Sequence, residues 1–150
     1  MYKLNRNVGF MTNKVSNKLK RYVGVELEEY GITAEQWVIT YTLYQNKQFN
    51  QKQLAEELDK DPVTVARIID ILVRKDFVEK EISKDDRRAY IVTLTESGKK
   101  LVDDLKCKLT QGLYRRAIEG ISKETYEAYL EALNIMDKNL TELSARSNKQ

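Results

Sequence analysis

The stretch from Asn50 to Leu94 limits most strongly what this chain can fold into, because signals for two short helices and a hairpin follow one another within it. Asn50 and Gln53 have the spacing of a capping box at the start of the first helix. Asp61 is a good N-cap for the second helix, and Pro62, the single proline, falls at its first position, where a missing N–H costs nothing. We therefore expect helix, turn and helix in this order.

The second of these helices divides into two faces. Its apolar face is predicted to pack into a core and consists of Val65, Ile68, Ile69, Leu72 and Val73. The opposite face carries short or basic side chains of the kind that contact bases in a DNA major groove: Val63, Thr64, Arg67, Ile71 and Arg74. All of these except Ile71 are assigned to that groove. An ordinary amphipathic helix with a solvated face would show the same pattern.

A hairpin is predicted next, because apolar residues alternate with polar ones around a charged loop. They are Phe77, Val78 and Ile82 before the loop, and Tyr90, Val92 and Leu94 after it. The loop is longer than a tight turn and holds Asp85, Asp86, Arg87 and Arg88. Arginine on such a tip suits a narrow minor groove, where the potential is most negative. We expect Arg88 and its neighbour Arg87 to reach this groove, and Asp86 to orient Arg88.

Amphipathic helices are predicted on both sides of this module, over residues 3–30 and 100–143. The first should end at Gly31, and a short helix should start at a capping box formed by Thr33 and Gln36. After the hairpin, Thr95 should cap a helix that runs to about Glu119, and the chain should fray over residues 144–150. The fold class is therefore mainly α with a small β-hairpin wing.

The apolar stripes of these flanking helices are too long for one small module to bury. The simplest partner is the same helices of a second copy, so we predict a homodimer. A monomeric bundle that caps the module is the alternative.

Length and composition indicate one globular domain, or one domain with an additional interaction segment. The chain has 150 residues, 41% of them hydrophobic and 33% charged, with a net charge of +3. Residues 47–100 hold twelve Lys and Arg against eleven Asp and Glu, so DNA binding would depend on where charges lie rather than on their excess. No apolar run approaches the ~20 residues of a membrane span, and the N-terminal residues have no apolar signal region. We expect a cytoplasmic protein with no membrane partner.

Residues that carry catalysis or bind metals are scarce. Histidine is absent, and Cys107 is the single cysteine, interpreted as a small helical side chain rather than a redox switch. Neither a nucleophile motif nor a glycine-rich phosphate loop occurs. The sequence therefore predicts no enzyme, no catalytic residues, no metal site and no cofactor.

The order of these motifs resembles the MarR family of winged helix-turn-helix transcriptional regulators over residues 33–98, and the flanking helices extend the match across nearly all of residues 1–150. The motifs that carry the resemblance are the recognition helix, the Asp-x-Arg wing and the exit from the wing: Thr64–Leu72, Asp86-Arg87-Arg88 and Leu94–Gly98. Two positions depart from the family pattern. Asp76 stands where the family usually has glycine, and Ala66 stands where a hydroxyl residue is frequent.

The resemblance implies a regulator that dimerises through its terminal helices, occupies a pseudo-palindromic operator and most often represses transcription. It also implies a small aromatic or lipophilic effector between the dimer helices and the module. Candidate effector contacts, with core packing as the alternative for each, are Tyr22, Tyr30, Trp37 and Tyr41. The residues expected to hold phosphate at the start of the first module helix are Gln51, Lys52 and Gln53. The competing class is a winged-helix adaptor that binds proteins and has no DNA affinity.

Overall fold

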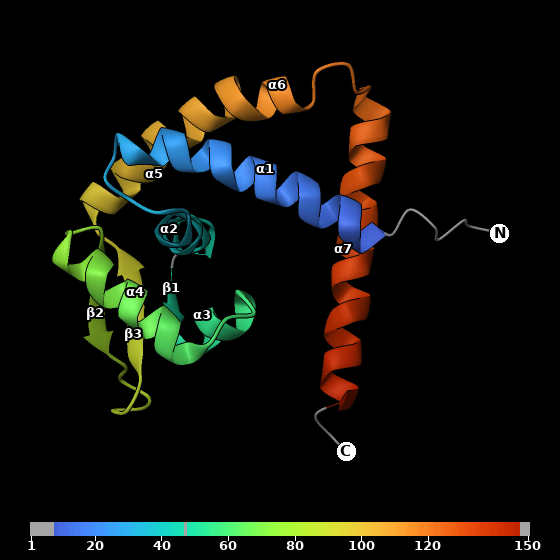
Figure 1. The fold of residues 1–150 in the computed structure, drawn as a ribbon. Helices are drawn as coiled ribbons and strands as arrows, with labels where there is room; N and C mark the ends of the chain where they lie inside the picture. The colour runs from blue at the N-terminus through green and yellow to red at the C-terminus, as the bar shows by residue number, and fades with distance from the viewer. Residues whose placement is uncertain (1–7, 47, 148–150) are drawn as a thin grey trace. The chain divides into compact units, whose positions relative to one another are not determined.

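The computed structural model describes residues 8–46 and 48–147, which are mostly helical with a small antiparallel sheet (Figure 1). The elements are, in order, α1 (Val8–Glu28), α2 (Ala34–Asn46), β1 (Gln48–Asn50), α3 (Gln51–Glu57), α4 (Pro62–Arg74), β2 (Val78–Ile82), β3 (Tyr90–Leu94), α5 (Glu96–Leu109), the π-helical turn η1 (Thr110–Tyr114), α6 (Arg115–Ala117) and α7 (Lys123–Ser147). They form two compact units, divided between Leu113 and Tyr114, and each is described separately.

Two capping boxes start α2 and α3 as predicted. The Thr33 hydroxyl accepts a hydrogen bond from the Gln36 amide, and the Gln36 side chain accepts one from the Thr33 amide, both at 3.2 Å. Asn50 and Gln53 repeat this exchange at 2.8 and 3.1 Å. Each pair satisfies two backbone donors that a helix start leaves free, which fixes where the helix begins.

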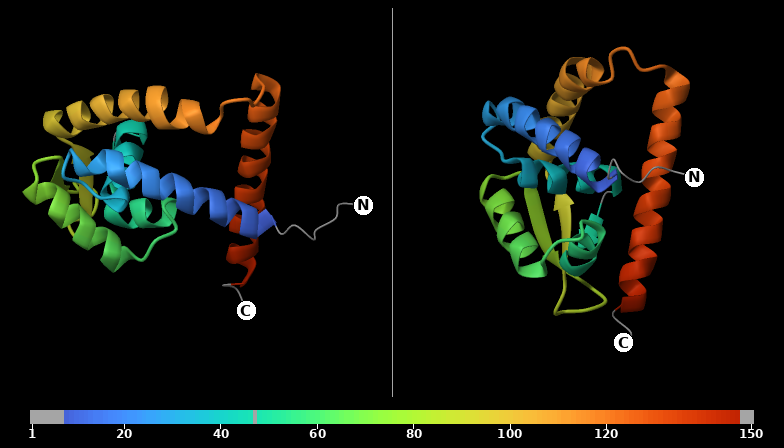
Figure 2. Two further views of the ribbon diagram at one scale, coloured as in Figure 1. Left: turned by 45° about the horizontal axis from the view of Figure 1, so that its top comes forward. Right: turned by 45° about the vertical axis from the view of Figure 1, so that its right-hand side comes forward.

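The sheet has three strands in the order β1-β3-β2, all antiparallel. The predicted hairpin is present, with Val78 paired to Leu94 at its base and Ile82 paired to Tyr90 beside the loop. The predicted apolar alternation holds only at the base, because Ile82 and Tyr90 are exposed. The hairpin loop extends from the sheet at the end where α4 begins (Figures 1 and 2).

The core of the first unit lies between the sheet and the helices α1, α2, α4 and α5. Figure 1 shows α1 crossing α2 and α5, and α1 packs against both. Fully buried side chains come from every one of these helices and from the sheet: Leu27, Ile39, Leu43, Ile69, Leu72, Val92, Leu105 and Leu109. The C-terminal half of α1 and all of α5 therefore belong to the same core as the helix-turn-helix.

The helix after the hairpin departs from the single helix predicted to run to about Glu119. A π-helical turn interrupts it over Thr110–Tyr114, and the chain leaves the helical conformation by Gly120, whose φ is +81°. Ser122 caps α7, since its hydroxyl oxygen accepts a 3.2 Å hydrogen bond from the Thr125 amide. A π turn inserts one extra residue into a helix, and the spacing of apolar residues does not reveal such an insertion. The sequence therefore could not predict it.

The predicted fraying from Ser144 is wrong as far as Ser147, because α7 continues to that residue. The Ser144 hydroxyl donates a 3.1 Å hydrogen bond to the Leu140 carbonyl, so a polar side chain here is accommodated within the helix. Residues 148–150, and residues 3–7 of the first predicted helix, lie outside the described residues.

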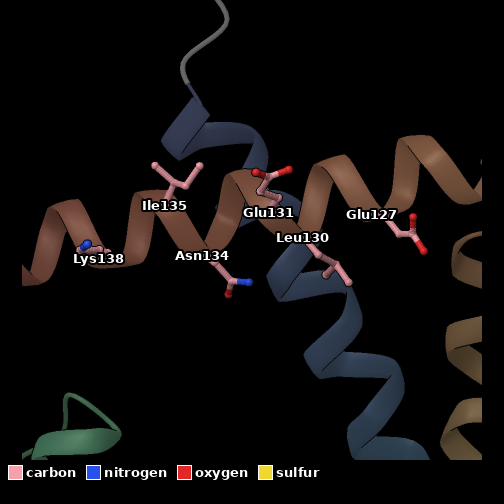
Figure 3. A pocket seen from close by; sticks show the side chains of 6 residues that line it. All are labelled: Glu127, Leu130, Glu131, Asn134, Ile135 and Lys138. Atoms are coloured by element: carbon pink, nitrogen blue, oxygen red, sulfur yellow. The ribbon is translucent and has the colours of Figure 1, made fainter.

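The second unit, described from Tyr114, buries none of its side chains as far as Arg146. Apolar residues recur along α7 at intervals of three and four: Tyr126, Tyr129, Leu133, Met136, Leu140 and Leu143. Other α7 residues line a shallow surface pocket of about 490 Å³, where Leu130 points to one side and Ile135 to another (Figure 3). None of the described helices is long and apolar enough to cross a membrane.

Candidate nucleic-acid interface

The first turn of α4 is built by Asp61, Pro62 and Thr64. Asp61 is the N-cap, and its Oδ2 accepts hydrogen bonds from the Thr64 amide at 2.8 Å and from the Thr64 hydroxyl at 3.0 Å. Pro62 is the first helical residue, as predicted, so its missing N–H leaves no partner unsatisfied. This combination fixes the start of α4 and holds Thr64 in one orientation.

The two predicted faces of α4 are present. The residues that pack into the core are Val65, Ile68, Ile69 and Leu72, and Val73 is half-buried. On the opposite face Val63 is 76% exposed, and Arg67 and Arg74 are also exposed. Thr64 and Ile71 are half-buried at the border between the faces. The outer face of α4 therefore offers one methyl-bearing and two cationic side chains to a partner.

A cleft of about 400 Å³ lies between the first turn of α3, the first turns of α4 and the hairpin loop. Its lining residues are Asn50, Gln51, Lys52, Pro62, Ala66, Asp86, Arg88, Ala89 and Tyr90. The structure thus brings Gln51 and Lys52, predicted to hold phosphate, together with Arg88 of the predicted wing. Pro62, Ala66 and Tyr90 were not assigned to the site, because only the fold places the two helix starts beside the loop.

Gln53, the third residue predicted to hold phosphate, lies elsewhere. Its side chain is engaged in the capping box with Asn50, and it lines a different surface pocket with Glu56 and Glu57. Carboxylates repel phosphate, so this second pocket does not suit a nucleic-acid backbone. The residue's contribution is to fix the first turn of α3.

The hairpin loop is held by short-range hydrogen bonds that start at Asp86. Its carboxylate accepts a 2.9 Å hydrogen bond from the Arg88 amide, and its carbonyl accepts one of 2.9 Å from the Ala89 amide. The Ser83 amide closes the loop with a 2.9 Å bond to the Ala89 carbonyl. Asp86 was expected to orient the Arg88 side chain, but the bond it makes is to the Arg88 backbone. A hydrogen bond from a backbone amide to the aspartate side chain two residues earlier is typical of a turn. The Arg88 side chain is exposed.

Lysines and arginines differ in their partners between residues 33 and 100. Lysines form ion pairs in this range, with N–O distances of 2.6 to 4.0 Å: Lys52–Glu56, Lys60–Glu35, Lys80–Asp70 and Lys99–Glu96. By contrast, within residues 8–46 and 48–147 no acidic side chain forms an ion pair with Arg67, Arg74, Arg87 or Arg88. The module is nearly neutral, yet the arginines on α4 and the loop keep their charge available for an anionic partner.

Two lysines to which the sequence analysis assigned no role hold α4 in place. Lys75, the C-cap of α4, donates hydrogen bonds to the Gly31 carbonyl and, at 3.2 Å, to the Gln36 side chain. Lys80 of β2 pairs with Asp70 of α4 at 2.6 Å. One contact fixes the end of α4 to the corner between α1 and α2, and the other fixes its middle to the hairpin. Local sequence patterns do not predict these pairings, because the partners lie ten residues apart or more.

The four aromatic residues proposed for an effector site are in different environments. Trp37 is buried, with 8% of its surface exposed, and its ring centroid lies 5.4 Å from that of Tyr41. Tyr41 and Tyr30 are half-buried, whereas Tyr22 is exposed. Other residues line the three pockets described above. Packing into the core accounts for Trp37, and the effector site stays a prediction. No group of acidic, cysteine or histidine residues in the described chain is arranged to hold a metal ion.

Comparisons with known proteins identify the family. A family model described as MarR family matches residues 32–90. YhbI, an uncharacterized HTH-type transcriptional regulator of Bacillus subtilis (strain 168), is 30% identical over 105 residues, which are 68% of this chain and 68% of YhbI.

Solved structures extend the likeness to both flanking regions. A MarR transcriptional regulator of Methanosarcina mazei Go1 is 31% identical, with a TM-score of 0.78, over 89% of this chain and 98% of that one. The S. aureus MepR–DNA complex is 25% identical, with a TM-score of 0.75, over 87% of this chain and 96% of MepR. This chain therefore belongs to the MarR family, a family of transcriptional regulators and not of enzymes.

Proposed function

We propose that this protein binds duplex DNA at an operator and regulates transcription by occupying it. The observation that carries the proposal is the set of exposed arginines on the outer face of α4 and on the hairpin loop, none of which forms an ion pair with a described residue. One of them, Arg88, lines a cleft together with the start of α3. A helix with exposed Val63 and Arg67 offers a methyl group and a bidentate donor to base edges. The S. aureus MepR structure contains DNA, which supports the same use of the shared fold.

The contacts divide by chemistry. Major-groove contacts are assigned to the outer face of α4: Val63, Thr64, Arg67 and Arg74. Gln51 and Lys52 bind phosphate from the start of α3, while Gln53 fixes that turn. Arg88, with Arg87 beside it, enters the flanking minor groove, and Asp86 shapes the loop that presents them.

The operator-binding form is a homodimer. The apolar stripe of α7 is not buried, and α1 carries a second exposed stripe of Val8, Met11, Val15, Tyr22 and Val25. Such stripes on the terminal helices support burial against a second copy, with residues 33–98 as the DNA-binding module of a single domain. A two-fold dimer reads a pseudo-palindrome whose half-sites lie about one helical turn apart, ~34–36 Å.

Regulation follows by repression, with release when a small aromatic or lipophilic effector binds near Trp37. Such a ligand acts by preferring a dimer whose α4 helices are misplaced for DNA, and a coupling of ~1–3 kcal/mol is sufficient. The protein works in the cytoplasm and has no catalytic activity.

A mobility-shift titration over a salt series tests the proposal. Electrostatic contacts to phosphate make log K fall steeply and linearly with log salt. The competing function is a protein-binding adaptor, which the near balance of acidic and basic residues in the module favours. An adaptor shows no operator selection from genomic fragments, and any residual DNA binding would lack sequence preference.

A further inference from the structure

We propose that Asp61 sets part of the base preference of α4 by fixing the direction in which the Thr64 hydroxyl forms hydrogen bonds. This inference rests on the proposed DNA-binding function. Thr64 Oγ1 lies 3.0 Å from Asp61 Oδ2, and the same oxygen accepts the Thr64 amide at 2.8 Å. A carboxylate has no proton to give, so the hydroxyl of Thr64 must be the donor in this contact.

Because the Thr64 hydroxyl donates its proton to Asp61, that proton is not available for a hydrogen bond to DNA. A threonine hydroxyl has one proton and two lone pairs, so Thr64 retains only acceptor capacity toward a partner. The donors exposed in the major groove are the N6 amino group of adenine and the N4 amino group of cytosine. Guanine O6 and N7, thymine O4 and the phosphate oxygens are acceptors and offer Thr64 no hydrogen bond.

Thr64 is therefore a specificity-determining residue that reads an amino group, and it does not bind the phosphate backbone. Its neighbours provide complementary chemistry: exposed Val63 offers methyl groups that suit thymine, and unpaired Arg67 offers donors that suit guanine. Asp61 acts through Thr64 and does not itself touch a base.

The negative charge of Asp61 is not required for this role, because an uncharged acceptor oxygen would hold the Thr64 hydroxyl in the same way. Asparagine caps a helix about as well as aspartate and would not repel the DNA backbone. The structure thus places a carboxylate at the start of the DNA-facing helix although capping alone does not need its charge.

The test is a set of operator selections from a random duplex library, with the full-length protein and four variants. For the wild type, we expect one base position that prefers adenine or cytosine over guanine or thymine by about fivefold. Thr64→Val keeps the shape but loses the hydroxyl, so this preference should vanish. Thr64→Ser keeps the hydroxyl and its bond to Asp61, so the preference should remain.

Two variants of Asp61 separate the acceptor from the charge. Asp61→Gly removes the acceptor at a small capping cost, frees the hydroxyl to donate and should relax the preference at the same position. Asp61→Asn keeps an acceptor oxygen, so it should retain the preference while raising the affinity for all duplexes by similar factors. Thermal unfolding of each variant shows that it is folded at the assay temperature.

The outcomes that overturn the inference are distinct from failure of the proposed function. A wild type that selects no operator overturns the proposed function and the inference with it. Selection that remains unchanged in Thr64→Val, a preference for guanine or thymine at the Thr64 position, or an unchanged preference in a folded Asp61→Gly variant overturns the inference alone. If Asp61→Gly does not fold, Thr64→Val and Thr64→Ser still decide whether the hydroxyl reads the base.

Discussion

Gly98 lies so close to the carbonyl oxygen of Phe77 that an added Cβ would stand only 2.0 Å from it. The same carbonyl accepts a 3.2 Å hydrogen bond from the Thr95 amide, and the Thr95 hydroxyl oxygen accepts a 3.0 Å bond from the Gly98 amide. The first turn of α5 is therefore fitted directly against the backbone that follows α4. Only a residue without a side chain fits at this point of contact.

Gly98→Ala should lower the free energy of unfolding by ~1–3 kcal/mol, because the backbone of Phe77 cannot move without disturbing the start of β2. Gly24→Ala is the matched control, since nothing lies within 4 Å of a Cβ built there and the residue is inside α1. That substitution should stabilise by ~0.5–1 kcal/mol. Urea unfolding of both variants measures the difference, and equal effects would contradict the close contact.

Asp76→Gly should raise the free energy of unfolding by ~0.5–1 kcal/mol, because Asp76 has a φ of +60°, a backbone conformation that costs an L-residue energy and costs glycine little. Asp76→Ala, which lacks the short polar side chain, should have the opposite sign. Both variants keep the hydrogen bond that the Thr95 hydroxyl donates to the carbonyl of residue 76. A loss of stability in Asp76→Gly would mean that the aspartate side chain makes a stabilising contact.

Arg67→Ala should weaken binding to the cognate operator by ~1–3 kcal/mol per half-site and relax the preference at one base position, because Arg67 is assigned to a base edge. Arg67→Lys is a useful comparison: it keeps the charge and the salt dependence but loses the bidentate fork, so it should still lose base preference. Competition between matched and scrambled operators provides the measurement. Equal losses on both duplexes would place Arg67 at the backbone instead.

Arg88→Ala should weaken cognate and A·T-rich non-cognate duplexes by more similar factors, since the minor groove offers potential and width but little sequence code. If Arg88 also neutralises a phosphate, the slope of log K against log salt should become shallower by ~0.9 per subunit. Asp86→Ala should weaken DNA binding in the same way but by a smaller factor, because it loosens the loop without removing a cation. An Arg88→Ala variant with unaltered affinity on every duplex would remove the wing from the interface.

Leu140→Asp should convert the dimer to a monomer and abolish operator binding, because Leu140 belongs to the apolar stripe of α7 and is 63% exposed in the single chain. Ile135→Asp is the matched control: Ile135 is 54% exposed but lies outside that stripe, and its substitution should leave the dimer intact. Neither change buries a charge in the monomer. Sedimentation at micromolar concentration gives the mass, and a monomeric wild type would contradict the proposed assembly.

Phenolic ligands should quench the fluorescence of Trp37 and weaken operator binding together, if the proposed effector site includes this residue. Trp37 is the only tryptophan, so the signal has one source. Since its side chain is buried, a ligand must displace packing around Trp37 and Tyr41, and quenching should be accompanied by a change in thermal stability. A broad ligand panel that leaves both fluorescence and DNA binding unaltered would exclude this class of effector.

The helix-turn-helix was predictable because its signals are local. Asn50, Asp61 and Pro62 act within one turn of their own positions, and the apolar periodicity of α4 appears directly in the chain. By contrast, β1 has only three residues and exists through its pairing with β3, some forty residues later. The cleft was foreseen only in part for the same reason. Tyr90 and Ala66 join Lys52 there through tertiary packing, which no local pattern encodes.

Asn50 connects the sheet, α3 and the cleft beside the hairpin loop. It ends β1, pairs there with Ile91 of β3, caps α3 and lines the cleft with Arg88. Lys80 also joins the hairpin to α4 through its ion pair with Asp70, so contacts connect the hairpin to both helices of the module. The proposed effector therefore has little scope to move the hairpin loop independently of α3 and α4. Under the proposed mechanism, the effector must therefore change the separation of the two DNA-binding modules in the dimer.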